Sequence, residues 1–315
     1  MQLTFNTCSG KECDETYSGL DLTVTVVPYV QYAAVAVTEN EEGQTVADIN
    51  GMYNGYEEVY VPEEISVNKL VFNRKFNTSG FSTIVLPVDI NGSNIDGLRQ
   101  VLKFDGMGVD ENGKKKVKMR AVWCQNDVNE VCSSLSGDLE AYTPYIIQLA
   151  DNTLTFKGSQ TLVPTKTPET RVGDWVFRGT LARHEWYDGD GEVGRVYGYA
   201  ANDATGVSAG DFVKFIDGAW IRPMRAYLIK EPVDRSFARG LNKNINVRAA
   251  DEDLPEKIEV EIIYEREDGS EETTVIGHFN TRTGEFILNR PARTFDLKGR
   301  NVNGTPKAKG MYIRK

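Results

Sequence analysis

Short apolar runs alternate with turn-forming residues along most of this chain. The runs are rich in Val, Ile, Thr, Tyr and Phe, recur about every eight to twelve residues, and are separated by clusters of Gly, Asn, Asp and Pro. Long stretches with the period of an amphipathic helix are missing. The pattern predicts an all-β chain: an antiparallel β-sandwich main domain with small flanking β modules. The expected strands are 22–27, 32–37, 66–72, 82–88, 117–123, 145–149, 175–181, 196–199, 212–216, 226–229, 257–264 and 273–279.

Turn signals and two polar stretches suggest how these strands are divided. Asn-Gly and Asp-Gly dipeptides such as Asn112-Gly113 and Asp217-Gly218 tolerate the positive φ of tight hairpin turns. Residues 62–64 end an N-terminal β segment, and residues 231–255 are polar with almost no apolar pairs. The predicted organisation is a partial N-terminal β module at 1–65, the main domain at 66–232, a linker at 233–256 and a C-terminal β module at 257–315.

Composition and charge narrow the class of protein. The 315 residues are 40% hydrophobic and 26% charged, which is typical of a globular chain. A net charge of −10 opposes long-range attraction to nucleic acid or anionic membranes. The basic run from Lys114 to Arg120 is read as a solvated strand face, so no nucleic-acid partner is expected. No run approaches the roughly 20 apolar residues of a transmembrane helix.

The N-terminus and the cysteines bear on the compartment. Leu3 and Phe5 already read as a strand rather than an export leader, so the numbering is expected to begin inside a longer polypeptide. The four cysteines form two close pairs, Cys8 with Cys13 and Cys124 with Cys132. Close pairs suit local disulfides in an oxidising compartment. Free thiols are the alternative, and a zinc site is disfavoured by the spacing and by the presence of only two histidines.

The sequence offers no recognisable catalytic constellation. A hydrolytic triad needs a base beside its nucleophile, and the only histidines are His184 and His278. His184 lies in Arg183-His184-Glu185-Trp186 without a GxSxG motif and is interpreted as a structural strand residue. Carboxylate pairs of the glycosidase type could be drawn from many of the 46 acidic residues, so their presence is not evidence for an enzyme. We expect a non-catalytic protein.

One loop has the residue types of a ligand site. Asp188, Asp190 and Glu192 alternate with glycines and resemble the first half of a calcium loop, although Val193 stands where an EF-hand needs glycine. Calcium is therefore a possible cofactor and no other is expected. Aromatic residues beside acids also suit sugars, because a ring stacks on the sugar face while carboxylates accept from its hydroxyls. The residues of this candidate glycan site are Trp186, Tyr187, Asp188, Asp190 and Trp220.

The C-terminal segment has a family resemblance. Phe295-Asp296-Leu297-Lys298-Gly299-Arg300 followed by Lys309-Gly310-Met311-Tyr312-Ile313 resembles the closing motif of C-terminal tails in secreted surface proteins of Bacteroidetes and Fibrobacter. Upstream runs such as 76–88 and 142–147 resemble the β domain that often precedes such a tail. Residues 294–297 and 311–313 are expected to pair as a hairpin. The residues that carry the sorting motif are Phe295, Asp296, Leu297, Gly299, Arg300, Gly310 and Tyr312.

The resemblance implies a secreted, cell-surface location reached by a type IX-like route, with the tail acting as an address or anchor. The implied partners are upstream domains of the same polypeptide and the secretion machinery. The expected function is therefore a structural and sorting or anchoring module of a larger bacterial surface protein. The alternative is an adhesin-like carbohydrate-binding module that holds polysaccharide through exposed aromatic residues.

Overall fold

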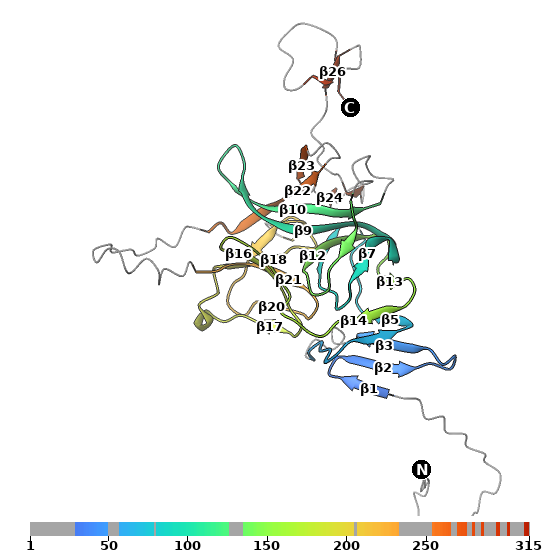
Figure 1. Cartoon of the computed structure of the whole chain (residues 1–315). Helices are drawn as coiled ribbons and strands as arrows, with labels where there is room; N and C mark the ends of the chain where they lie inside the picture. Colours follow the sequence, from blue (N-terminus) through green and yellow to red (C-terminus); the bar gives the residue numbers. More distant parts are fainter. Residues whose placement is uncertain are drawn as a thin grey trace, which may run out of the picture.

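The described part of the chain is built almost entirely of β-strands (Figure 1). The computed structural model describes residues 29–49, 57–78, 80–125, 135–204, 207–232, 254–265 and 270–275, and the short strands 279–280, 285–286, 294–296, 301–302 and 312–314. Helical structure in these residues is limited to 3₁₀ turns such as Gly92–Asn94 and Asp188–Asp190. The all-β prediction is confirmed. Within the described residues no helix has the length and apolar character to cross a membrane.

The largest sheet has eleven strands and curls around its own core. Its order from edge to edge is β15 (Glu169–Val172), β16 (Trp175–Gly179), β21 (Ala226–Lys230), β18 (Val196–Tyr199), β19 (Phe212–Lys214), β22 (Lys257–Glu265), β10 (Lys115–Cys124), β9 (Leu98–Val109), β12 (Tyr145–Leu149) and β6 (Phe81–Ile84), with β23 (Glu271–Val275) paired to β22. Apolar side chains from both halves of the sheet meet inside the curl, including Phe104, Phe177 and Phe212. The aromatic rings of Phe177 and Phe212 meet edge to face at 5.9 Å.

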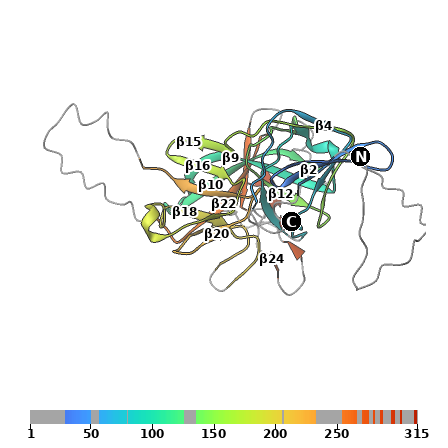
Figure 2. The same ribbon diagram turned by 90° about the horizontal axis from the view of Figure 1, so that it is seen from below.

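A six-stranded sheet lies beside the large one (Figure 2), and short strand pairs form separate two-stranded sheets. Its order is β1 (Tyr29–Tyr32), β2 (Val35–Glu39), β3 (Thr45–Ile49), β5 (Lys69–Phe72), β13 (Leu154–Phe156) and β8 (Ile95–Asp96). The short pairs are β7 (Ile90–Asn91) with β11 (Asp138–Leu139), β4 (Ile65–Val67) with β14 (Gln160–Leu162), β17 (His184–Glu185) with β20 (Trp220–Ile221), and β24 (Phe279–Asn280) with β25 (Glu285–Phe286). A second apolar core joins the two sheets, with Val101 and Ile147 of the large sheet packed with Leu70 and Phe72 of the smaller one.

The long hairpin of β9 and β10 shows how local sequence sets the geometry. Its turn is the predicted Asn112-Gly113, where Gly113 has φ +76° and the Asp110 carboxylate accepts the backbone N–H of Lys114. The register shifts by one residue opposite Met119, and Gly106 at the shift has φ +102°. An extra residue of this kind is a β-bulge, which bends a long strand and helps the sheet to curl.

Two pairings correct the predicted organisation. β3 and β5 run parallel, as do β10 and β22, so the sheets are mixed rather than wholly antiparallel. The predicted domain boundary after residue 65 does not separate two modules, because β3 and β5 on either side of it belong to the same six-stranded sheet. The boundary at 257 is wrong for β22, because this strand fills the position between β19 and β10. Residues 233–253 of the predicted linker lie outside the described residues.

The predicted C-terminal hairpin is present as strand pairing. β26 (Thr294–Asp296) pairs with β28 (Tyr312–Arg314) in antiparallel register, and β27 (Asn301–Val302) adds to the other side of β26. Phe295 lies opposite Ile313, and Asp296 lies opposite Tyr312. These three strands form a sheet of their own. Leu297, Gly299, Arg300 and Gly310 of the sorting motif lie outside the described residues.

The basic run of β10 is more tightly paired than a solvated face. Lys116 is buried and contacts Glu259 of β22 and Asp110, the latter at 3.6 Å. Arg120 reaches Asp105 and Glu271, each at 2.8 Å, and Glu265 at 3.3 Å. Carboxylates of neighbouring strands therefore neutralise the cations at both positions, and these two side chains hold the β9, β10 and β22 region together.

Candidate functional site

The predicted glycan loop is anchored by Trp186, which corrects its assigned role. Its side chain is fully buried, at 0% exposure, so it cannot stack on a sugar. The indole packs against His184, Phe215 and Tyr227 at ring-centre distances of 4.3, 4.9 and 4.8 Å. Its Nε1–H donates to Glu192 Oε2 at 2.9 Å. An indole buried with its one donor satisfied is a core residue.

Two of the three acids of the loop, Asp190 and Glu192, form hydrogen bonds within the loop itself. Asp190 Oδ2 accepts the backbone N–H of Tyr187 at 2.8 Å, and the backbone N–H of Asp188 donates to Asp217 Oδ1 at 3.0 Å. Glu192 accepts from Trp186. Among the described residues no three His, Cys, Asp or Glu side chains gather as metal ligands. The described structure therefore does not gather Asp188, Asp190 and Glu192 into the predicted calcium site, because the Asp190 and Glu192 carboxylates bond to Tyr187 and Trp186 instead.

The exposed aromatic residues of the predicted site are Tyr187 and Trp220. Tyr187 is 52% exposed, and its hydrogen bond to Glu185 raises the pKa of its hydroxyl. Trp220 is 46% exposed and lies opposite Glu185 across the β17–β20 pair, which places it beside the Asp188–Asp190 turn. The guanidinium carbons of Arg183 and Arg222 lie 4.8 and 5.5 Å from the Trp220 ring centre. Cation–π contacts of this kind hold the guanidinium groups beside the ring.

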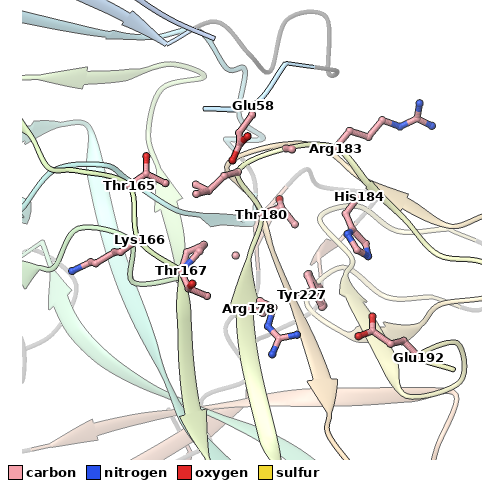
Figure 3. Close-up of a pocket in the computed structure, with 14 residues that line it drawn as sticks. Glu58, Thr165, Lys166, Thr167, Arg178, Thr180, Arg183, His184, Glu192 and Tyr227 are labelled. Carbon is pink, nitrogen blue, oxygen red and sulfur yellow. The ribbon is translucent and has the colours of Figure 1, made fainter. Parts of the chain in front are cut away.

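Two clefts flank this region. The first, which we call the Arg178 cleft, has a volume of about 630 Å³ and is lined by β16, the 165–168 segment and the start of β17 (Figure 3). Glu58, His184, Glu192 and Tyr227 surround it with Arg178. The second, the Arg225 cleft, has a volume of about 520 Å³ and is lined by Thr83, Tyr199, Phe215, Trp220, Arg222 and Arg225 among others.

Trp186 packs behind the linings of both clefts, and we call it the shared wall. Two of its three ring neighbours, His184 and Tyr227, line the Arg178 cleft, and the third, Phe215, lines the Arg225 cleft. Phe215 in turn lies across Gly198, where any Cβ would come within 2.2 Å of the ring. Glycine at 198 is therefore required for this ring to form part of the second cleft.

In the Arg178 cleft the central cation is paired inside the protein. Arg178 Nε lies 3.2 Å from Glu169 Oε2, and Arg178 Nη2 lies 2.5 Å from Glu231 Oε1. Arg171 joins the same network at 2.7 Å from Glu231. The hydrogen bond from Arg171, and after it that from Arg178, hold the pKa of Glu231 at about 2. The network ties β15, β16 and the end of β21 together, which is a structural role.

Two threonine hydroxyls in the Arg178 cleft likewise form hydrogen bonds within the protein. Thr180 Oγ1 donates to the carbonyl of Arg222 at 2.8 Å, and Thr165 Oγ1 accepts the backbone N–H of Val61 at 2.7 Å. His184 is exposed and its ring lies against Trp186. These contacts fit the interpretation of His184 as a structural strand residue.

The arginines of the Arg225 cleft differ from Arg178 in their partners. Among the described residues, neither Arg222 nor Arg225 forms an ion pair, and none of the described lining residues is acidic. Arg74 lies behind Thr83 and is buried, and its Nη1 donates to the carbonyls of Thr83 and Met224 at 2.7 and 3.1 Å. Burial and the charge of Arg225 lower the pKa of Arg74, and burial and the charge of Arg222 lower that of Arg225.

The sequence contained a signal for this second cleft that our reading of it missed. Trp220, Arg222 and Arg225 follow one another, and no acidic residue occurs between Asp217 and Glu231. In a chain of net charge −10, an aromatic residue with two arginines and no nearby acid is a local reversal of charge. Thr83 and Tyr199 could not have been added, because only the fold brings them to the same place.

The cysteines are described in part. Cys124, at the end of β10, is disulfide-bonded, which agrees with the predicted oxidised state. Its predicted partner Cys132 and the pair of Cys8 and Cys13 lie outside the described residues.

No protein-family model matches this chain, and neither does any curated protein or solved structure.

Proposed function

We propose that this chain is a non-catalytic module of a secreted bacterial surface protein, in which the β body spaces or displays a partner domain and the C-terminal hairpin serves as an address or anchor. The observation that carries the proposal is the sheet of β26, β27 and β28, whose strands pair with one another and bear Phe295, Asp296 and Tyr312 of the tail motif. The disulfide at Cys124 supports an oxidising compartment.

Truncation of the parent protein tests the anchoring role. Removal of residues 294–315 in a host with type IX secretion should retain the protein inside the cell, measured by protease accessibility and whole-cell immunolabelling. The double variant Asp296→Ala, Tyr312→Ala should reduce display without shortening the chain. Arg99→Gln, a change of an exposed residue on β9, is the control and should leave display unchanged. Full surface display of the truncated protein would refute the address role.

A second function, glycan binding by the body, is favoured by one observation. Trp220 is a half-exposed aromatic residue at a cleft of about 520 Å³, a volume within the usual range for small-ligand sites. We infer that Trp220 contacts the ligand and that Trp186 supports the site from within the core.

Affinity electrophoresis on cellulose, xylan and pectin tests the glycan proposal. Trp220→Ala should abolish retardation. Tyr29→Ala, a change of an equally exposed aromatic residue on β1, should not affect it. Free migration of the wild-type protein in every gel would exclude glycan binding and leave the anchoring proposal unaffected.

A further inference from the structure

A row of three arginines leads into the Arg225 cleft. Arg222 and Arg225 line it, and Arg74 lies behind its Thr83 wall with 8% of its surface exposed. Arg74 Nε is buried without a hydrogen-bond partner. The positive charge of Arg225 acts on Arg74, and that of Arg222 acts on Arg225.

This row of positive charges raises the free energy of the folded protein when no ligand is bound. Arg74 is the buried cation of the row; two carbonyls accept from its Nη1 and its guanidinium lies 4.4 Å from the Phe76 ring centre, but no described carboxylate pairs with it. The half-buried Arg225 likewise has no described counter-ion, and like charges in the row add repulsion. Elsewhere the chain places carboxylates against its inward-facing cations, as Glu259 against Lys116 and Glu231 against Arg178. Asp211, whose charge acts on Tyr199, pairs with Lys257 at 3.4 Å. A ligand that carries negative charge would supply the counter-ion that the described residues do not.

The neighbours of the guanidiniums indicate the rest of the ligand. Trp220, Tyr199 and Phe215 present aromatic surface in the same cleft. Asn202 also lines the cleft, and since its Oδ1 accepts from Asn77 at 2.8 Å, its amide nitrogen can act as a donor. Aromatic faces suit the C–H surface of a sugar ring, and the planar fork of a guanidinium matches a carboxylate in two parallel hydrogen bonds.

We propose that the Arg225 cleft binds a carboxylate-bearing sugar, with Arg225 and Arg222 holding the carboxylate of a uronic acid unit and Trp220 contacting the ring. This assignment rests on the proposed glycan-binding function and narrows it to acidic saccharides. A cleft of about 520 Å³ exceeds the size of a simple inorganic ion and suits a ligand of one or two sugar rings. The net charge of −10 repels long polyanions such as nucleic acid, which favours a short acidic sugar.

Isothermal titration calorimetry of the full chain with digalacturonate and with neutral galactobiose tests the proposal. Digalacturonate should bind and galactobiose should bind at least about tenfold more weakly, because hydrogen bonds to a charged group contribute more than neutral ones. Arg225→Gln should weaken digalacturonate binding about tenfold or more, and Arg99→Gln should not change it. The affinity of the wild-type protein should fall when NaCl is raised to about 0.5 M, as screening requires.

Each alternative outcome identifies the part that fails. Equal binding of both disaccharides, unaffected by Arg225→Gln, would overturn the acidic specificity and leave glycan binding in place. Equally strong competition by acetate and digalacturonate would show a bare carboxylate site and overturn the sugar. Binding of neither disaccharide overturns the inference, and free migration on every polysaccharide as well overturns glycan binding. If Arg225→Gln changes the far-ultraviolet circular dichroism spectrum, Arg222→Gln, a substitution of an exposed residue, replaces it in the same comparison.

Discussion

The two clefts differ in how they treat their arginines. In the Arg178 cleft, the guanidinium is fixed between Glu169 and Glu231. In the Arg225 cleft, on the other side of Trp186, Arg222 and Arg225 have no carboxylate partner among the described residues. The first arrangement stabilises the fold whether or not a ligand is present, whereas the second costs free energy until a negative charge arrives. The presence or absence of an internal counter-ion therefore distinguishes a structural arginine from one available to a ligand.

Substitution of Trp186, the shared wall of the two clefts, should have the largest effect on stability. Trp186→Ala removes a fully buried indole that contacts Tyr227 on one side and Phe215 on the other, and it leaves Glu192 without its donor. The free energy of unfolding should fall by about 3–5 kcal/mol, the usual cost of emptying a core site of this size. Urea denaturation followed by circular dichroism measures the change.

Trp220→Ala is the matched control for the wall. Trp220 is half exposed, and its two cation–π contacts contribute roughly 0.5–1 kcal/mol each at an exposed site. Its loss should therefore cost about 1–2 kcal/mol at most. A Trp186→Ala protein as stable as Trp220→Ala would contradict the assignment of Trp186 to the core.

Paired substitutions of the two arginines test the comparison directly. Arg178→Met leaves the carboxylates of Glu169 and Glu231 without this guanidinium, and we expect it to lower the free energy of unfolding by about 1–3 kcal/mol. Arg225→Met keeps a side chain of similar length and removes a charge without a partner, so stability should stay within about 0.5 kcal/mol of wild type or rise. Both values come from urea denaturation without ligand. An equal loss in the two variants would show that Arg225 has an internal partner and would remove the distinction between the clefts.

Much of the fold could be predicted because strand periodicity is local. The expected runs 145–149 and 196–199 coincide with β12 and β18. The longest strand, β9, was missed because its bulge at Gly106 interrupts the alternation of apolar and polar residues. The parallel neighbours of β3 and β10 were also missed, since pairing between distant segments leaves no local signal.

The candidate site was predicted less well than the fold. Trp220 was grouped with the loop at 187 because of its residue type, and the β17–β20 pair does place it beside that loop. The sequence could not show that Trp186 points into the core while Trp220 points outward, because both flank a short strand pair with similar residue types. Nor could it show that the Asp190 carboxylate accepts the backbone N–H of Tyr187, since this depends on the turn geometry of Asp188–Asp190.

The smallest expected effect is the pH dependence of the Arg178 cleft. The pKa of Glu231 is about 2 in the folded protein and 4.5 without its partners, so the carboxylate is stabilised by folding above pH 4.5, and this contribution is lost as the pH falls toward 2. Near neutral pH the free energy of unfolding of the wild-type protein should exceed that of Glu231→Gln by about 1 kcal/mol or less, since the network is close to the surface. This difference should shrink toward zero as the pH approaches 2. Thermal unfolding of both proteins across this pH range measures the difference.

Glu63→Gln, a substitution of an exposed carboxylate without an ion pair among the described residues, controls for the change to an amide. A difference that stays constant down to pH 2 would mean that the ion pairs of Glu231 contribute nothing to stability, and the contrast between the two clefts would then rest on Arg225 alone.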